Sequence, residues 1–206
     1  MLRHDLTALA TRRDLYRAKL VFYAFLVSLG VFFAGSLLSY VIIRANAFRT
    51  PDVTRFPDYV QYEELVLPTT FWVSTGFLIL VSWMLQRAVY HARRNHVAFQ
   101  TRALLIAGVF AAGFVALQFE GLGELLRVRW AQDGPETKSY AICFTLAFLH
   151  ALHVIGGVAF LGFVIFQSSR NRYDHERHWP IDNCASYWHF LDVVWLLMLA
   201  TFLIAR

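Results

Sequence analysis

Cysteine is scarce in this chain, and its two cysteines are placed where they exclude the simplest uses of the residue. Cys143 falls near the start of the fourth apolar stretch, whereas Cys184 lies just before the fifth. If both stretches cross a membrane, the two thiols lie on opposite sides of it. They cannot then reach the Cα separation of about 4.4–6.8 Å that a disulfide needs. No metal-site spacing accompanies either cysteine, so we expect neither a disulfide nor a cysteine-bound metal.

The sequence also lacks internal repeats, low-complexity segments and long polar stretches. Its longest polar segments are the N-terminus and the connections between apolar blocks, each of roughly 20 residues. There are only five prolines, and Pro51 and Pro57 break the first connection. Since nothing in these segments is long enough for a second core, we expect a single domain over residues 1–206.

What the chain has in excess is apolar sequence. Hydrophobic residues make up 58% of it and the mean hydropathy is +0.47, whereas soluble domains are about half apolar. The excess lies in five blocks, each near the ~20 residues that cross a hydrocarbon core. Only helices satisfy their own backbone in lipid, so we predict an all-α integral membrane protein, a five-transmembrane-helix bundle. The predicted spans are residues 20–43, 65–85, 103–126, 140–166 and 187–204.

The basic residues predict an orientation. Five of them precede the first apolar block, which at 24 residues is too long for a secretory signal, so we expect this span to be retained. The N-terminus and the second and fourth connections carry twelve lysines and arginines, against seven on the other side. The richer side should be cytoplasmic. This puts the N-terminus inside and the C-terminus outside. We therefore interpret the net charge of +5 as a topology signal and expect no nucleic-acid surface.

Small residues recur inside the spans. Gly30 with Ala34, Gly108 with Ala112, and the pair Gly156-Gly157 stand where helices can approach backbone to backbone. These positions are typical of helical membrane proteins in general, so they favour a packed bundle without indicating a function.

Polar residues within the last two spans raise the question of function. His150 and His153 lie on one face of the fourth span, and His189, Asp192 and Trp195 lie on one face of the fifth. Ionisable residues inside a membrane usually face a partner or a pathway. Because His150 and His189 differ in depth by more than about 10 Å, a haem held between them would be awkward.

The third span carries its own polar residues toward its outer half. Gln118 precedes Glu120 and Glu124, and the spacing of Glu120, Glu124 and Arg127 along one face allows an internal ion pair. At ~1.5 Å per residue, Glu120 and His150 lie about 10 and 15 Å below the outer surface and are close enough to meet. By the same estimate, a direct bond between His153 and Asp192 would be strained.

Three interpretations of these residues stay open from the residues themselves. One is ligation of a redox metal or haem, which lacks an obvious further ligand. Another is a proton or ion path, although the polar residues do not extend across the membrane. The third is a set of interhelical hydrogen bonds together with an interface to a partner subunit. The third accounts for the most residues and is the interpretation we favour.

The last two spans also resemble a known family, the subunit III family of haem-copper oxidases. The segment FLHALHVIGG, within residues 145–157, is similar to its penultimate helix, and YWHFLDVVWL, residues 187–196, is similar to its final helix nearly residue for residue. Upstream, FVALQFEG at residues 114–121 resembles the preceding helix. Weaker similarities cover the first two spans and are carried by Phe32, Phe33, Ala34, Tyr40, Arg44, Pro68, Ser74, Thr75, Gln86, Arg87 and Ala88. The resemblance extends over residues 15–206.

The resemblance implies an accessory subunit of the short, five-helix bacterial type in the inner membrane. Such a subunit has no catalytic residue or redox centre of its own. It packs beside oxidase subunits I and II, of which the first holds haem and copper, and it binds phospholipid and supports sustained oxygen reduction. The polar residues that would hold helices, lipid or a subunit interface are Gln118, Glu120, Glu124, His150, His153, Trp188, His189, Asp192 and Trp195.

Two positions depart from the family pattern. Leu29 stands where many members carry a buried glutamate in the first helix, and Gly121 stands where many have a glutamate after the glutamine corresponding to Gln118. The first departure argues against a direct acid-base role in proton uptake. Two alternatives remain open: subunit III of a quinol oxidase or of a nitric-oxide-reductase-associated complex, and, from another class, a small haem-b anchor that carries electrons itself.

Overall fold

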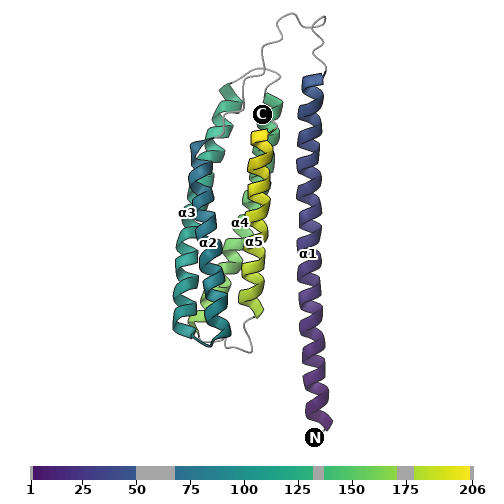
Figure 1. The fold of residues 1–206 in the computed structure, drawn as a ribbon, viewed down its shortest axis with the longest axis vertical. Helices are drawn as coiled ribbons and strands as arrows, with labels where there is room; N and C mark the ends of the chain where they lie inside the picture. Colours follow the sequence, from purple (N-terminus) through teal and green to yellow (C-terminus); the bar gives the residue numbers. More distant parts are fainter. Residues whose placement is uncertain (1, 50–67, 132–136, 171–178, 205–206) are drawn as a thin grey trace, which may run out of the picture. The chain divides into compact units, whose positions relative to one another are not determined.

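The structure, a computed structural model, is all-helical in the part of the chain that it describes, residues 2–49, 68–131, 137–170 and 179–204. Within these ranges it has five helices (Figure 1). Their bounds are α1 Leu2–Arg49, α2 Thr69–Arg93, α3 Val97–Ala131, α4 Thr137–Ser169 and α5 Trp179–Ile204.

Five helices in the described residues are long and apolar enough to cross a membrane. They contain the predicted spans in the predicted order, which confirms the all-α, five-helix class; the orientation stays a prediction. The helices extend past the apolar blocks because polar residues at the span ends can keep helical geometry where water is available. The second helix is the exception at its start, since Pro68 is not helical and α2 begins at Thr69.

The chain divides into two compact units, Met1–Ser36 and Leu37–Arg206. The first unit is the N-terminal part of α1. Two serines on it, Ser28 and Ser36, donate hydrogen bonds to the carbonyl oxygens of Ala24 and Phe32 four residues earlier, at 2.9 and 2.8 Å. These bonds satisfy the hydroxyls within the helix itself, as an apolar surrounding requires.

Helices α2 to α5 form a closed bundle in the second unit. Each packs on two neighbours, in the circular order α2, α3, α4, α5 and back to α2 (Figure 1). Successive helices run in opposite directions. Each helix packs on its neighbours in the sequence, and α5 packs on α2 to close the ring. The largest side chains at the centre are Trp188, Trp195, Phe71 and Phe114, all with less than 2% exposure.

A tight reversal joins α2 to α3. Asn95 has a φ of 58°, in the left-handed region that asparagine tolerates better than most residues. Its amide donates to the Ala92 carbonyl at 3.1 Å, and the amide of His96 donates to the His91 carbonyl at 2.9 Å. This is the two-bond Schellman ending of a helix. The helical conformation is therefore interrupted between Arg93 and Val97, where α3 begins.

Glycines set the distance between α2 and α3. A Cβ atom at Gly113 would lie 2.6 Å from the Phe77 ring, and one at Gly121 would overlap the Phe71 ring. Both rings belong to α2. Phe71 occupies the space that a side chain at position 121 would fill, which gives a packing reason for glycine at this position.

The expected small-residue contacts are present on α4. A Cβ at Gly157 would lie 3.1 Å from the Tyr187 ring and 3.2 Å from the Leu191 side chain, both on α5, and a Cβ at Gly108 on α3 would lie 3.1 Å from Ile165 on α4. Ala112, the expected companion of Gly108, is exposed instead. The α4–α5 contact therefore depends on Gly157, next to the histidines of α4.

Candidate functional site

The centre of the site is a stack of His150 on Trp195. Their ring centres are 5.4 Å apart and the planes are inclined by 29°, and each side chain is only 1% exposed. The indole Nε1 of Trp195 donates to the Thr75 hydroxyl at 2.9 Å, and that hydroxyl donates in turn to the Phe71 carbonyl at 2.7 Å. Three helices, α4, α5 and α2, are joined through this one indole.

Aromatic rings close the stack from the remaining sides. The Phe71 ring meets Trp195 edge to face at 5.2 Å, and the Phe114 ring meets it in the same manner at 6.3 Å. Phe114 belongs to α3, so all four helices of the bundle reach this tryptophan. Edge-to-face contacts of this kind contribute about 0.5–1.5 kcal/mol beyond the burial of the rings.

His189 is the centre of a second polar cluster, about 9 Å along α5 from Trp195. Its Nδ1 is hydrogen-bonded to the Ser82 hydroxyl, and its Nε2 lies 3.4 Å from Gln86 Oε1, both on α2. Asp192 lies one turn away, with Oδ2 3.9 Å from Nδ1. The cluster joins α5 to α2.

His153 and Tyr187 make the polar contact between α4 and α5. The Tyr187 hydroxyl donates to the His153 carbonyl oxygen at 2.9 Å. The His153 ring turns back on its own helix, where Nδ1 lies 2.7 Å from the Leu149 carbonyl oxygen. His153 and Asp192 thus have separate partners, in line with the strain expected for a direct bond between them. Trp188, next to Tyr187, is fully buried against Gly157.

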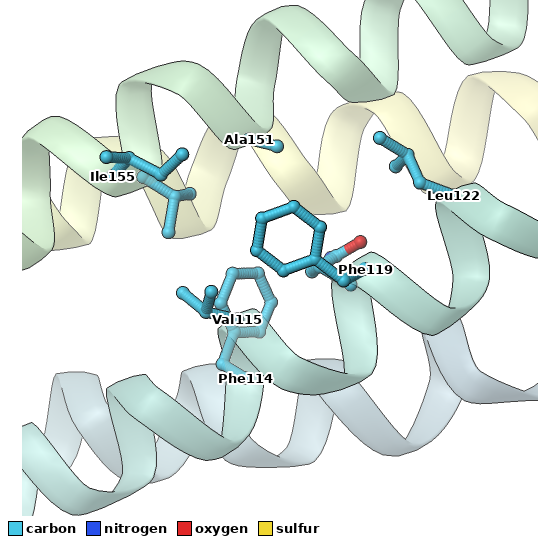
Figure 2. A pocket seen from close by; sticks show the side chains of 8 residues that line it. Phe114, Val115, Phe119, Leu122, Ala151 and Ile155 are labelled. Carbon is cyan, nitrogen blue, oxygen red and sulfur yellow. The ribbon is translucent and has the colours of Figure 1, made fainter.

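Gln118 lies at a narrow crevice between α3 and α4. The side chain is 5% exposed, and its Nε2 has no hydrogen-bond partner in the described part of the chain. Figure 2 shows the apolar side chains around the crevice, with Phe114, Val115, Phe119 and Leu122 from α3 and Ala151 and Ile155 from α4. The crevice has a volume of about 20 Å³. That is the room of roughly one water molecule, so no cofactor ring fits in it.

The two glutamates of α3 do not join the site. Glu120 and Glu124 are exposed on the outside of the helix, away from the buried histidine of α4. The ion pair that the sequence allows with Arg127 is not formed among these three described residues. The helix turns this face outward, so the two carboxylates do not reach the buried residues of the site.

The α2 partners of the site are absent from the residues predicted from the sequence. Thr75, Ser82 and Gln86 face α5 and make the bonds described above. They are spaced by seven and four residues, which places them on one stripe of an otherwise apolar helix. That spacing was a usable signal, but single hydroxyls in a span are usually satisfied by their own backbone, as for Ser28 and Ser36.

Two further polar contacts lie at the end of the bundle near the α2–α3 turn. Gln100 and Thr101 on α3 both bond the Ser168 hydroxyl on α4, at 3.0 and 2.8 Å. Arg93 on α2 pairs with Asp182 on α5 at 3.3 Å. The first contact is buried and joins α3 to α4, and the second is exposed and joins α2 to α5. Polar bonds, between side chains or to a backbone carbonyl, therefore join α2 to α5, α3 to α4 and α4 to α5. A short turn joins α2 to α3.

The described residues include no group of three or more His, Cys, Asp or Glu side chains that could hold a metal ion. The arrangement of the histidines bears on the haem alternative separately. One face of His150 is covered by Trp195, and both ring nitrogens of His189 face α2 side chains. A haem between these two histidines would have to displace Trp195, which holds the bundle together. The geometry therefore suits helix association better than axial ligation.

Comparisons with known proteins agree with the resemblance in the last two helices. The family model described as cytochrome c oxidase subunit III matches residues 134–205, which include all of α4 and α5. The site residues from His150 to Trp195 all lie within this match.

Individual relatives extend the similarity over more of the chain. The chain is 26% identical over 176 residues to cytochrome c oxidase subunit 3 of Thermostichus vulcanus, covering 84% of this chain and 80% of that protein. It is 26% identical over 181 residues to the probable cytochrome c oxidase subunit 3 of Nocardia farcinica, covering 85% and 82%. For the Mus musculus protein of the same name the identity is 28% over 134 residues, covering 65% of this chain and 47% of that protein.

The coverage separates the two kinds of relative. This chain spans most of the length of the bacterial proteins but about half of the mouse protein, in line with a short form of five helices. Together, the match over α4 and α5, the bacterial relatives and the five membrane-length helices support a place for this multi-pass membrane protein in the haem-copper oxidase subunit III family.

Proposed function

We propose that the chain is a non-catalytic accessory subunit of a proton-pumping terminal oxidase, most simply a cytochrome c oxidase of the short subunit III type. It packs on subunit I, binds phospholipid and supports sustained reduction of oxygen by its partner. The observation that carries this proposal is the use of the polar residues in the membrane. Trp195 and Tyr187 on α5 bond neighbouring helices, and the crevice at Gln118 has room for about one water molecule.

The polar contacts favour one arrangement of the helices. An interhelical hydrogen bond in a membrane is worth about 0.6 kcal/mol on average and up to ~1.7 kcal/mol. The bonds from Trp195 to Thr75 and from Tyr187 to the His153 carbonyl are of this kind. A bundle held in one arrangement presents a fixed surface, which is what a subunit that supports a catalytic neighbour needs.

The outer surface of the bundle suits both a partner and lipid. Large apolar side chains on several helices are exposed, among them Val109 on α3, Phe163 on α4, and Val193 and Leu197 on α5. In a membrane these side chains face either lipid tails or the helices of subunits I and II. Haem and copper belong to those partners and supply the oxygen chemistry, while this chain contributes packing. Membership of a larger respiratory supercomplex is compatible with the same surface.

The proposed setting is the inner membrane of a bacterium. The twelve lysines and arginines of the N-terminus and of the second and fourth connections would face the cytoplasm. With five helices, the N-terminus is then inside and the C-terminus outside. We further propose that the five helices act as one membrane domain, because the polar segments between the spans are too short for another.

A gentle-detergent purification of the tagged chain tests the proposal. We expect haem- and copper-bearing subunits to co-purify, and the chain to be colourless once dissociated from them. A partner that oxidises cytochrome c would support the main proposal, whereas one that oxidises quinol or reduces nitric oxide would move the chain to the related complexes. A chain that is purified alone and has a Soret band would support the haem-b anchor instead.

A further inference from the structure

An exposed face of α2 has a hollow that is separate from the buried stack at Trp195. Trp83, Gln86, Arg87 and Tyr90 are spaced by three, one and three residues and so share one face of the helix. They line a surface pocket of about 370 Å³. Trp83 and Tyr90 are about half exposed, at 53% and 50%. A hollow of aromatic and basic side chains is thus open on the outside of the bundle.

The charge of this pocket is positive and uncompensated. The Arg87 guanidinium lies 5.5 Å from the centre of the Trp83 ring, and Arg94 lies 4.2 Å from the centre of the Tyr90 ring at the edge of the pocket. Within the described residues, Arg87 has no carboxylate partner, whereas Arg93 on the other side of the helix pairs with Asp182. The pocket therefore offers a cation to an anion from outside the chain.

An apolar track leads away from the pocket along the same face of α2. Trp72, Gly76 and Ile79 precede Trp83 at helical spacing, and all three are exposed. A Cβ atom placed on Gly76 would meet nothing within 4 Å, so the track is open at that point. The cationic pocket lies at the polar end of the span, and the track extends from it along the helix toward Trp72, near the start of α2.

We propose that this face binds an anionic phospholipid. Arg87 holds the phosphate, Trp83 and Tyr90 lie at the level of the headgroup, and an acyl chain follows the nearer part of the track over Ile79. A guanidinium matches a phosphate through two parallel hydrogen bonds. Tryptophan and tyrosine are enriched at the boundary between lipid and water, and basic clusters on the cytoplasmic side attract anionic lipids. The inference deepens the proposed function, on which it rests for the membrane setting.

Gln86 connects this lipid to the helix bundle. Its side chain lines the pocket, and its Oε1 lies 3.4 Å from His189 Nε2 on α5. A headgroup that contacts the Gln86 amide on the outside therefore holds it in the position where it meets His189. The lipid would act as a brace between α2 and α5 and supplement the Ser82 bond on the inside.

Native mass spectrometry of the full-length chain, reconstituted with phosphatidylglycerol or phosphatidylcholine vesicles and then returned to detergent, tests the proposal. We expect preferential retention of phosphatidylglycerol, reduced about fivefold or more by Arg87→Gln, since one basic residue near an anionic surface is worth ~1 kcal/mol. Arg87→Lys should keep part of the retention because it keeps the charge. Arg102→Gln is the matched control, because Arg102 also lies over an exposed ring, that of Phe99, outside the pocket.

Three results would overturn the proposal. One is an equal loss in Arg87→Gln and Arg102→Gln, which would indicate only general surface charge. Another is equal retention of phosphatidylcholine. The third is unchanged lipid with fewer co-purified oxidase subunits in Arg87→Gln, which would assign the face to an acidic surface of a partner protein. Because lipid retention is measured on the chain itself and assembly on the subunits that co-purify with it, failure of the lipid site is distinguishable from failure of the accessory-subunit role.

Discussion

Trp195 is the residue on which the interior of the bundle depends. Its ring is stacked on His150, is met edge-on by Phe71 and Phe114, and its indole nitrogen donates to Thr75. The similarity of residues 187–196 to a family helix indicated that this tryptophan matters, but not that four helices meet there. Its partners come from segments that are distant in the sequence, and a depth estimate along single helices does not identify them.

Thr75 provides the sharpest test of that arrangement at the residue scale. Thr75→Val removes the hydroxyl and leaves the buried Trp195 Nε1 without an acceptor, so we expect a loss of about 1–2 kcal/mol in the free energy of unfolding. Thr75→Ser keeps the hydroxyl and should lose less than about 0.5 kcal/mol. Unfolding of the full chain in mixed micelles, followed by tryptophan fluorescence, measures both. Equal losses in the two variants would show that the hydrogen bond contributes nothing.

At the scale of helices, hydropathy predicted the number and order of the spans but not their ends or their contacts. The apolar blocks stop where solvent begins, whereas the backbone continues as helix, so α1 and α3 extend well beyond residues 20–43 and 103–126. The ion pair allowed among Glu120, Glu124 and Arg127 failed for a related reason. Spacing places residues on one face of a helix, but it does not say whether that face turns inward.

Gly121 tests the contact between α2 and α3. Gly121→Ala places a Cβ atom where the Phe71 ring lies, and Phe71 is fully buried against Trp195, so it has no space to move. We expect a loss of about 1–3 kcal/mol in stability, the usual cost of overpacking. Gly123→Ala, two residues later, meets nothing within 4 Å and should be neutral or stabilise α3. Thermal unfolding of the two variants in one detergent decides the matter; similar midpoints would contradict the packing described.

Asn95 tests the reversal between the same two helices. A β-branched side chain is strained at a φ of 58°, so Asn95→Val should destabilise the α2–α3 turn by about 1–2 kcal/mol, whereas Asn95→Gly should be neutral or stabilising. Hydrogen exchange of the Asn95 and His96 amides, which donate the two hydrogen bonds of the turn, reports on the turn locally. Faster exchange in Asn95→Gly than in Asn95→Val would contradict the turn geometry.

At the scale of the whole molecule, helix packing and redox chemistry are assigned to different chains. The polar residues of α4 and α5 hold the helices of one chain together, and the redox chemistry is assigned to its partners. From the sequence, the family and the five-helix class could be predicted because they depend on composition and on one specific helix. The α2 side of the site, with Thr75, Ser82 and Gln86, and the exposed pocket at Arg87 required the arrangement in space.

The measurement that tests the central claim most directly is the composition and turnover of the oxidase purified with His189→Ala or His150→Ala in this chain. Both changes remove bonds or packing between helices, and His150→Ala also leaves a cavity beside Trp195. The account predicts less of this chain per haem-bearing subunit and faster loss of activity during turnover, with initial turnover per haem little changed. A complex of normal composition that has lost its initial activity would contradict it, because the histidines would then take part in the reaction itself.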